Sequence, residues 1–302
     1  MYDVVVVGHL CIDSILLPGK NRPYVILGGS AAYVSLSATR LGSKASIISK
    51  VGGDFPKAYL WWLKEEGVDL SGVARVADAQ STRFELKYND DFSNRILRLK
   101  SRAPSITIDD TKKSLKAKAL HIAPIAGEIT YETVEGLKGC ADVLSLDPQG
   151  LIRDFDGDGN IVGNKPVDKR ILEFVNIYKS TLEEIKAVSG LSDLQSAFKA
   201  IHDFGVETIL VTMGLRGAVM SIEKTTYNIP AFPTGNVIDP TGAGNVFIGS
   251  FLADYIRGED IVWCAYVGSA AASIAVESVG PTGLGEKTEI YQRARLLYEK
   301  EL

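Results

Sequence analysis

Short apolar runs that alternate with helical stretches are the feature that most restricts the fold of this chain. The stretches between the runs have the composition of helices, and all four of those at residues 29–42, 55–67, 129–139 and 194–205 end in Gly, as helix C-termini often do. Continuous apolar runs rich in β-branched residues suit strands that are buried on both faces. The alternation therefore predicts an α/β protein with a mostly parallel central sheet and helices on both of its faces. The predicted strands are DVVVVG (3–8), ASIISKVG (45–52), ALHIAP (119–124), VLSLDP (143–148), VNIYKS (175–180) and TILVTMG (208–214).

Two segments break this alternation. Residues 82–101 contain two strands of alternating polarity around Asn89-Asp90-Asp91, which is a hairpin signal. Residues 14–26 are extended and are interrupted by Pro and Gly. Together they predict a small sheet, either surface decoration or a lid over the strand ends, where open α/β sheets bind ligands. We favour the lid and, because no linker or repeat is apparent, a single domain over 1–302.

Composition excludes several classes of protein. The formal net charge is −4 and the pI is about 5.6, which disfavours a nucleic-acid partner. The three cysteines and three histidines are scattered, which disfavours disulfides and a zinc site. No apolar run approaches the ~18 residues of a membrane span. We therefore expect a cytoplasmic protein without a membrane partner.

The stretch DPTGAGNVFIGSF (239–251) carries the clearest chemical signal. Its glycines precede a helical run, and the first N–H groups of a helix have no internal partners and carry partial positive charge. Glycine lets an anion come close to such a backbone. The stretch therefore indicates either an anion site or a plain loop-to-helix turn.

DPTGAGN resembles the carboxy-terminal signature Asp-Thr-x-Gly-Ala-Gly-Asp of the ribokinase-like, PfkB-type carbohydrate kinases. The resemblance covers nearly the whole chain, because further family motifs follow in the expected order. They are GHLCID (8–13), GGSAAY (28–33), VGGDF (51–55), TLEEIKAVSG (181–190), VTMGLRGA (211–218) and GSAAASIAVESVGP (268–281). The resemblance implies a three-layer α/β/α fold with a small β-sheet lid and transfer of a γ-phosphoryl group to a sugar or polyol hydroxyl.

The resemblance also implies roles for particular residues. Asp13 would bind acceptor hydroxyls, and Gly28 and Gly29 would admit the acceptor close to the backbone. Glu184 would hold Mg²⁺ through water, with Asp239 as a further possible metal contact. ATP would be the co-substrate, and a monovalent cation is compatible with the family pattern. The anion hole would consist of the N–H groups of Gly242, Ala243 and Gly244, and the nucleotide site of Thr212, Gly214, Gly217, Ala271 and Ser273.

Departures from the family pattern narrow the choice of acceptor substrate. Tyr33 stands where the family often has Asn and, with the segments at 85–104 and 146–153, resembles the archaeal myo-inositol kinase branch. This similarity favours a cyclitol acceptor. Candidates for substrate or phosphate contacts, each of which could equally be an ordinary surface or helix-end residue, are Arg102, Asp147, Gln149 and Arg153. A homodimer through the lid would protect the exposed edges of the small sheet.

Asn245 occupies the position of the family's general base, an Asp. An amide cannot accept a proton at neutral pH. Three explanations stand: an engineered Asp-to-Asn substitution, a natural relative that has lost catalysis, or a different base such as Asp239. Two function classes follow, an ATP-dependent kinase and a catalytically silent sugar- or nucleotide-binding protein.

Overall fold

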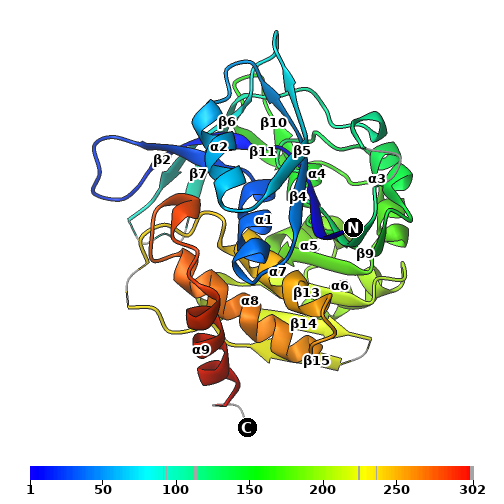
Figure 1. The fold of residues 1–302 in the computed structure, drawn as a ribbon. Helices are drawn as coiled ribbons and strands as arrows, with labels where there is room; N and C mark the ends of the chain where they lie inside the picture. The colour runs from blue at the N-terminus through cyan, green and yellow to red at the C-terminus, as the bar shows by residue number, and fades with distance from the viewer. Residues whose placement is uncertain (91, 93, 112–114, 224, 236, 300–302) are drawn as a thin grey trace.

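A nine-stranded sheet forms the centre of the molecule (Figure 1). The computed structural model describes residues 1–90, 92, 94–111, 115–223, 225–235 and 237–299. Seven neighbouring strands pair in parallel, whereas the two strands at one edge are joined to the sheet and to each other by antiparallel pairing. In spatial order they are β15 (Thr225–Ile229), β14 (Ala218–Ile222), β13 (Thr208–Thr212), β12 (Ile177–Thr181), β9 (Ala141–Leu146), β8 (Ala117–Ile122), β1 (Tyr2–Val7), β4 (Ala45–Gly52) and β5 (Asp69–Val76).

Helices cover both faces of this sheet because its central strands alternate their side chains between two cores. Val4 and Val6 of β1 belong to one core, whereas Val5 and Val7 belong to the other. The predicted α/β/α layering is therefore confirmed. The first core is covered by α1 (Ser30–Arg40), α2 (Lys57–Glu65), α7 (Ala243–Tyr255), α8 (Ile261–Ala275) and α9 (Lys287–Tyr298), and the second by α3 (Tyr131–Leu137), α5 (Leu182–Ser189) and α6 (Leu194–His202).

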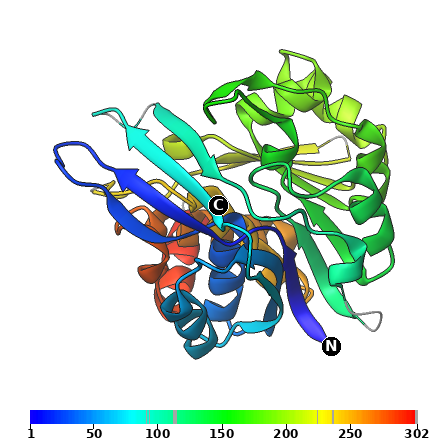
Figure 2. The ribbon, with the colours of Figure 1, turned by 90° about the horizontal axis from the view of Figure 1, so that it is seen from above.

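A second, four-stranded sheet extends outward from the main sheet (Figure 2). Its order is β3 (Tyr24–Gly28), β2 (Cys11–Leu16), β6 (Thr82–Tyr88) and β7 (Arg95–Ser101), with β2 and β6 parallel and the other pairs antiparallel. Both segments predicted for the lid contribute strands, although the first strand begins earlier, at Cys11. In the predicted hairpin turn, Asp91 lies outside the described residues.

The inner face of the small sheet is apolar and packs above the end of β8. Side chains of β6 alternate strictly, so that Phe84, Leu86 and Tyr88 are buried. They form a third core with residues that include Ile125 and Ala126, which follow β8. The small sheet is thereby held over one end of the main sheet. The remaining elements there are the short helix α4 (Gln149–Ile152) and the hairpin β10 (Arg153–Phe155) and β11 (Ile161–Asn164).

The order of the strands in the main sheet indicates where a ligand would bind, because the chain proceeds outward from the middle of the sheet in two directions. From β1 it proceeds to β4 and β5 on one side, and later from β8 through β9 and β12 on the other. Ligands of open α/β sheets bind at the carboxyl ends of strands where the order reverses in this way. That point lies between β1 and β8. Of the helices in the described part of the chain, none is both long and apolar enough to cross a membrane.

Candidate active site

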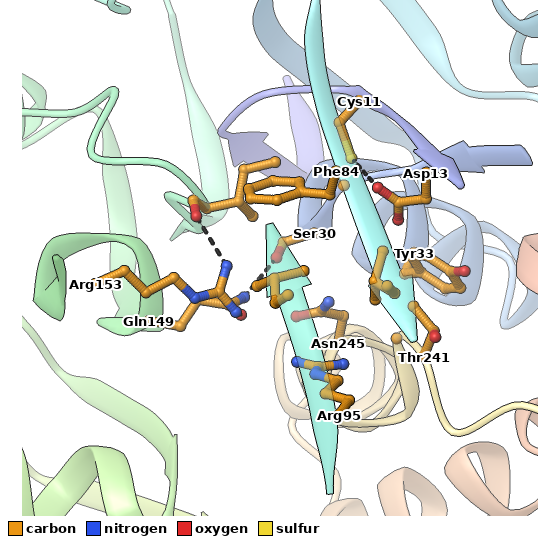
Figure 3. Close-up of a pocket in the computed structure, with 15 residues that line it drawn as sticks. Cys11, Asp13, Ser30, Tyr33, Phe84, Arg95, Gln149, Arg153, Thr241 and Asn245 are labelled. Carbon is orange, nitrogen blue, oxygen red and sulfur yellow. Dashed lines mark hydrogen bonds between the residues drawn. The ribbon is translucent and has the colours of Figure 1, made fainter. Parts of the chain in front are cut away.

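A pocket lies at these strand ends, between the small sheet and the start of α7 (Figure 3). The elements around it come from five parts of the sequence, which parallel topology brings to one edge. Seven of the predicted site residues line it, namely Asp13, Gly29, Tyr33, Gln149, Arg153, Gly242 and Asn245. The other lining residues are Cys11, Ser30, Phe84, Leu86, Arg95, Leu97, Ile125 and Thr241.

Asp13 is a buried carboxylate on β2 that faces the pocket. Burial raises its pKa to about 6, although the Cys11 thiol donates a 2.9 Å hydrogen bond to Oδ1 and opposes the rise. A Cβ atom at Gly28 would stand 2.0 Å from Oδ2 of Asp13, so only glycine leaves room for this carboxylate. The arrangement suits a carboxylate that accepts hydrogen bonds from ligand hydroxyls.

The first turn of α7 presents unpaired backbone donors to the pocket. The helix has neither a side-chain cap nor an acidic residue in its first turn. Within the described chain, the N–H groups of Gly242 and Gly244 make no backbone hydrogen bond, whereas Ala243 N–H donates to Pro240 O at 3.3 Å. Two of the three predicted anion-hole donors are therefore unpaired, and the third is engaged in this structure. Such a helix start attracts anions.

Gly242 is required where the loop passes Tyr33. Its φ of 82° lies in the left-handed region, and a Cβ atom there would come within 2.4 Å of the Tyr33 ring. Tyr33 is itself 2% exposed, and its hydroxyl has no hydrogen-bond partner among the described residues. A buried polar atom without a partner is costly, so this hydroxyl is suited to meet a ligand.

Asn245 repeats this pattern at the predicted position of the general base. Its Oδ1 atom is buried and has no hydrogen-bond partner among the described residues. The amide oxygen can accept a hydrogen bond from a ligand hydroxyl but cannot take its proton. The side chain at 245 can thus orient an acceptor without deprotonating it.

Gln149 ties the Gly-Gly segment to the opposite wall of the pocket. Its Nε2 donates to Ser30 Oγ at 2.8 Å, and its Oε1 accepts from Arg153 Nη2. Arg153 also donates to Ile125 O at 2.8 Å. These bonds hold the Arg153 guanidinium at the pocket, and its contact with substrate or phosphate stays a prediction.

A buried ion pair lies beside the start of α7 and was not anticipated from the sequence. Lys179 Nζ donates to Asp147 Oδ2 at 2.7 Å, with side-chain exposures of 5% and 1%. A Cβ atom at Gly244 would stand 2.9 Å from this ammonium group, so the amine is next to the unpaired backbone donors. The sequence signal was a charged residue inside an otherwise apolar strand, which is rare unless the charge is paired.

Several predicted contact residues lie outside the pocket. Asp147 has both oxygens engaged, by Lys179 and by Gln149 N–H at 3.0 Å, and is fully buried. Arg102 is exposed and is not part of the pocket lining. In this structure Asp147 therefore holds Lys179, and its contact with the acceptor stays a prediction.

The predicted nucleotide-binding residues divide into two groups. Thr212, Gly214 and Gly217 lie at and just after the end of β13, and a Cβ atom at Gly244 would stand 3.8 Å from Thr212 Oγ1. Ala271 is fully buried in the first core, and Ser273 is 6% exposed and accepts a hydrogen bond from Arg293. Thr212 of the first group thus adjoins the start of α7, whereas the second group is covered in this structure.

The metal contacts predicted from the family differ in how available they are. Glu184 Oε2 accepts the Thr181 N–H at 2.7 Å in a capping box at the start of α5, while Oε1 makes no hydrogen bond to the described residues. Asp239 is buried and accepts from Thr241 N–H and Gly280 N–H. Within the described part of the chain, no group of three or more His, Cys, Asp and Glu side chains is placed to hold a metal. Mg²⁺ retains waters and needs only one or two carboxylates, so Glu184 with its unpaired oxygen fits this ion. Both oxygens of Asp239 already accept backbone N–H groups.

The fold and the site together define an α/β protein in which a buried carboxylate and a helix start with unpaired N–H groups face one pocket. The chain belongs to the pfkB family of carbohydrate kinases, whose model matches residues 1–288. It is 28% identical to the cytidine kinase of Thermococcus kodakarensis over 283 residues, which cover 93% of this chain and 98% of the relative. It is also 28% identical to the inositol 3-kinase of Arabidopsis thaliana over 284 residues, 92% of this chain and 74% of that one.

Solved structures share the fold. One is a pyrophosphate-dependent kinase of the ribokinase family complexed with a pyrophosphate analogue and myo-inositol, with a TM-score of 0.79 and 21% identity over 96% of this chain and 99% of that one. Another is the nucleoside kinase of Methanocaldococcus jannaschii, with a TM-score of 0.79 and 24% identity over 98% and 99%. The ribokinase-like fold predicted from the sequence is confirmed.

Proposed function

We propose that this protein is a kinase that transfers the γ-phosphoryl group of ATP to a hydroxyl of a polyol, with a cyclitol such as myo-inositol as the favoured acceptor. The observation that carries the proposal is the placement of Asp13 and the start of α7 on one pocket. The carboxylate accepts acceptor hydroxyls, and the unpaired N–H groups of Gly242 and Gly244 receive the charge that develops on the transferred phosphoryl. Membership of a carbohydrate kinase family supports this assignment.

The distribution of polar groups around the pocket favours a polyhydroxylated ring. Asp13, the Tyr33 hydroxyl and Asn245 Oδ1 each offer a hydrogen-bonding atom, and the last two have no partner in the described chain. A ring with hydroxyls in several directions can satisfy all of them. The inositol 3-kinases among the relatives support this choice, whereas the cytidine and nucleoside kinases make nucleosides the rival acceptors.

The catalytic step consists mainly of positioning and charge stabilisation. Asn245 and Asp13 orient the acceptor hydroxyl toward the phosphorus, its oxygen forms the new bond, and the bridging bond to ADP breaks. Because Asn245 cannot take the hydroxyl proton, the proton passes late to a phosphoryl oxygen of the product. Mg²⁺ neutralises donor phosphates when bound, and Glu184 would hold it through water.

The small sheet is proposed to act as a lid over the acceptor. It contributes Phe84, Leu86 and Leu97 to the pocket wall, and the Tyr88 hydroxyl bonds Thr241 Oγ1 at 2.9 Å beside the start of α7. A closed sheet excludes water, which would otherwise compete with the acceptor hydroxyl.

A homodimer through this sheet is part of the proposal. Its edge strands β3 and β7 carry Val25 and Ile96, whose exposures of 60% and 65% are high for large apolar side chains. Exposed edges with apolar residues favour pairing with another chain, and a second copy of this chain is the partner we propose.

A coupled assay of ADP release across cyclitols, sugars and nucleosides tests the proposal. Turnover with a cyclitol supports it, and faster turnover with a nucleoside would reassign the acceptor. Saturable acceptor binding by calorimetry without any turnover would instead indicate a catalytically silent binding protein.

A further inference from the structure

Two arginine side chains point into the pocket without an acidic partner (Figure 3). Arg95 comes from β7 of the small sheet, and Arg153 from the start of β10. Arg95 Nη1 donates to Tyr88 OH at 3.1 Å, and Arg153 donates only to the oxygens of Ile125 and Gln149. Neither forms an ion pair within the described chain, although other arginines do.

The charges of the pocket are unbalanced toward positive. Among the residues that line it, Asp13 carries the one carboxylate, whereas Arg95 and Arg153 both carry guanidinium groups. Burial lowers the pKa of Arg153, and the positive charge of Arg95 lowers it further. Carboxylates such as that of Glu184 act on both guanidinium groups only from beyond ion-pair distance, so an anion that binds between the two arginines would be stabilised by both.

The position of Arg95 connects it to the start of α7. Tyr88 OH bonds both Arg95 and Thr241 Oγ1, and Thr241 immediately precedes Gly242. Arg95 shares the inner face of β7 with Leu97, because strand side chains alternate. The docked small sheet therefore holds a guanidinium beside the backbone donors that would receive a phosphoryl group.

We propose that Arg95 is a catalytic residue that stabilises the phosphoryl group in transit, brought to it by the small sheet, with Arg153 on the opposite side. The proposal rests on the proposed kinase function. As the acceptor oxygen bonds to the γ-phosphorus, the bond from phosphorus to the bridging oxygen breaks. ADP leaves with that electron pair, and the hydroxyl proton passes to a phosphoryl oxygen of the product. During the transfer, negative charge spreads over the three equatorial oxygens of the phosphoryl group. A guanidinium group beside these oxygens stabilises that charge.

This arrangement links closure to chemistry. With the sheet open, the transferred group would lack one of its two guanidinium contacts, so hydrolysis by water would be slow. With the sheet docked on Thr241, both contacts are made. The rate of transfer thus depends on the acceptor-bound, closed state.

Steady-state kinetics of Arg95→Ala, Arg95→Lys and Arg98→Ala test the proposal. Arg98 lies on the same strand but faces outward, where its Nε donates to Asp158 O, and it serves as a matched control. We expect Arg95→Ala to lower kcat by about 10²–10³-fold, as loss of one donor that stabilises transition-state charge does. Arg95→Lys should recover part of this loss, and acceptor KM should change by less than about threefold.

A binding measurement separates catalysis from folding. By calorimetry with saturating acceptor, Arg95→Ala should bind ADP with unchanged affinity but ADP–aluminium fluoride, a transition-state mimic, at least about tenfold more weakly. An increase in acceptor KM with kcat unchanged would overturn the proposal, since Arg95 would then bind an anionic acceptor. Wild-type kcat in Arg95→Ala would also overturn it and leave the kinase function standing. Absence of turnover in the unsubstituted protein would overturn both.

Discussion

At the scale of single residues, the site differs from its family at Asn245 and agrees with it at Asp13. Asn245 keeps the shape of the expected Asp and leaves Oδ1 buried without a partner. Asp13 keeps a carboxyl group at this buried position, although burial disfavours its ionised form and raises its pKa to about 6. Retaining a charge at such a cost is typical of functional sites.

This pKa predicts a pH dependence of acceptor binding. Only the ionised Asp13 accepts two hydroxyl hydrogens, so acceptor affinity should fall by up to about tenfold per unit as pH drops below about 6. The stability of the ligand-free protein depends on pH in the opposite sense. Because the folded pKa exceeds the unfolded value, the stabilising contribution is complete at low pH and is lost as pH rises through 6. Calorimetric titrations from pH 5 to 8 measure the first effect.

Asp13→Asn is the matching control. It should bind acceptor more weakly at pH 8, because a charge-assisted hydrogen bond worth about 1.5–3 kcal/mol is lost. It should also show no change in affinity between pH 5 and 7. A pH dependence that survives this substitution would assign the effect to another group.

At the scale of elements, the small sheet is the part that we propose to move when the acceptor binds. It packs on Ile125 and Ala126 and reaches Thr241 through Tyr88, so we expect its position to respond to whatever fills the pocket. By contrast, α9 packs on α8 and contributes no residue to the pocket lining.

Hydrogen exchange checks this role of the small sheet. Peptides from residues 82–90 and 94–101 should exchange more slowly with saturating acceptor, because closure protects their backbone. Peptides from α9 should be unaffected. Equal exchange of the small sheet in both states would reduce it to surface decoration.

At the scale of the whole molecule, exposed Val25 and Ile96 predict a dimer through the small sheet. Ile96→Lys should shift the protein toward monomer in sedimentation equilibrium, since it buries a charge at the interface. Leu296→Lys, on the exposed face of α9, should leave the oligomeric state unchanged. A monomeric unsubstituted protein at all concentrations would contradict the dimer.

Sequence reasoning recovered the layers because the central strands are continuous runs of β-branched residues, a pattern few other folds require. It missed the start of the small sheet at Cys11, because register with β6 depends on a pairing of distant segments. Lys179 escaped prediction for the same reason, since its partner Asp147 follows a different strand, β9. Arg95 was missed because strand alternation gives the face of a side chain but not what that face covers.

Phosphoryl transfer beside Asn245 is the central step of the proposed kinase function. Turnover by the unsubstituted protein and by Asn245→Asp, with the same cyclitol and ATP, tests it in one measurement. A carboxylate at 245 can take the hydroxyl proton, so the variant should turn over about 10²-fold faster at neutral pH, with acceptor affinity little changed. The gain should fade at acidic pH as the new carboxylate protonates. If neither protein releases ADP while the acceptor still binds, the protein is not a kinase and the account is contradicted.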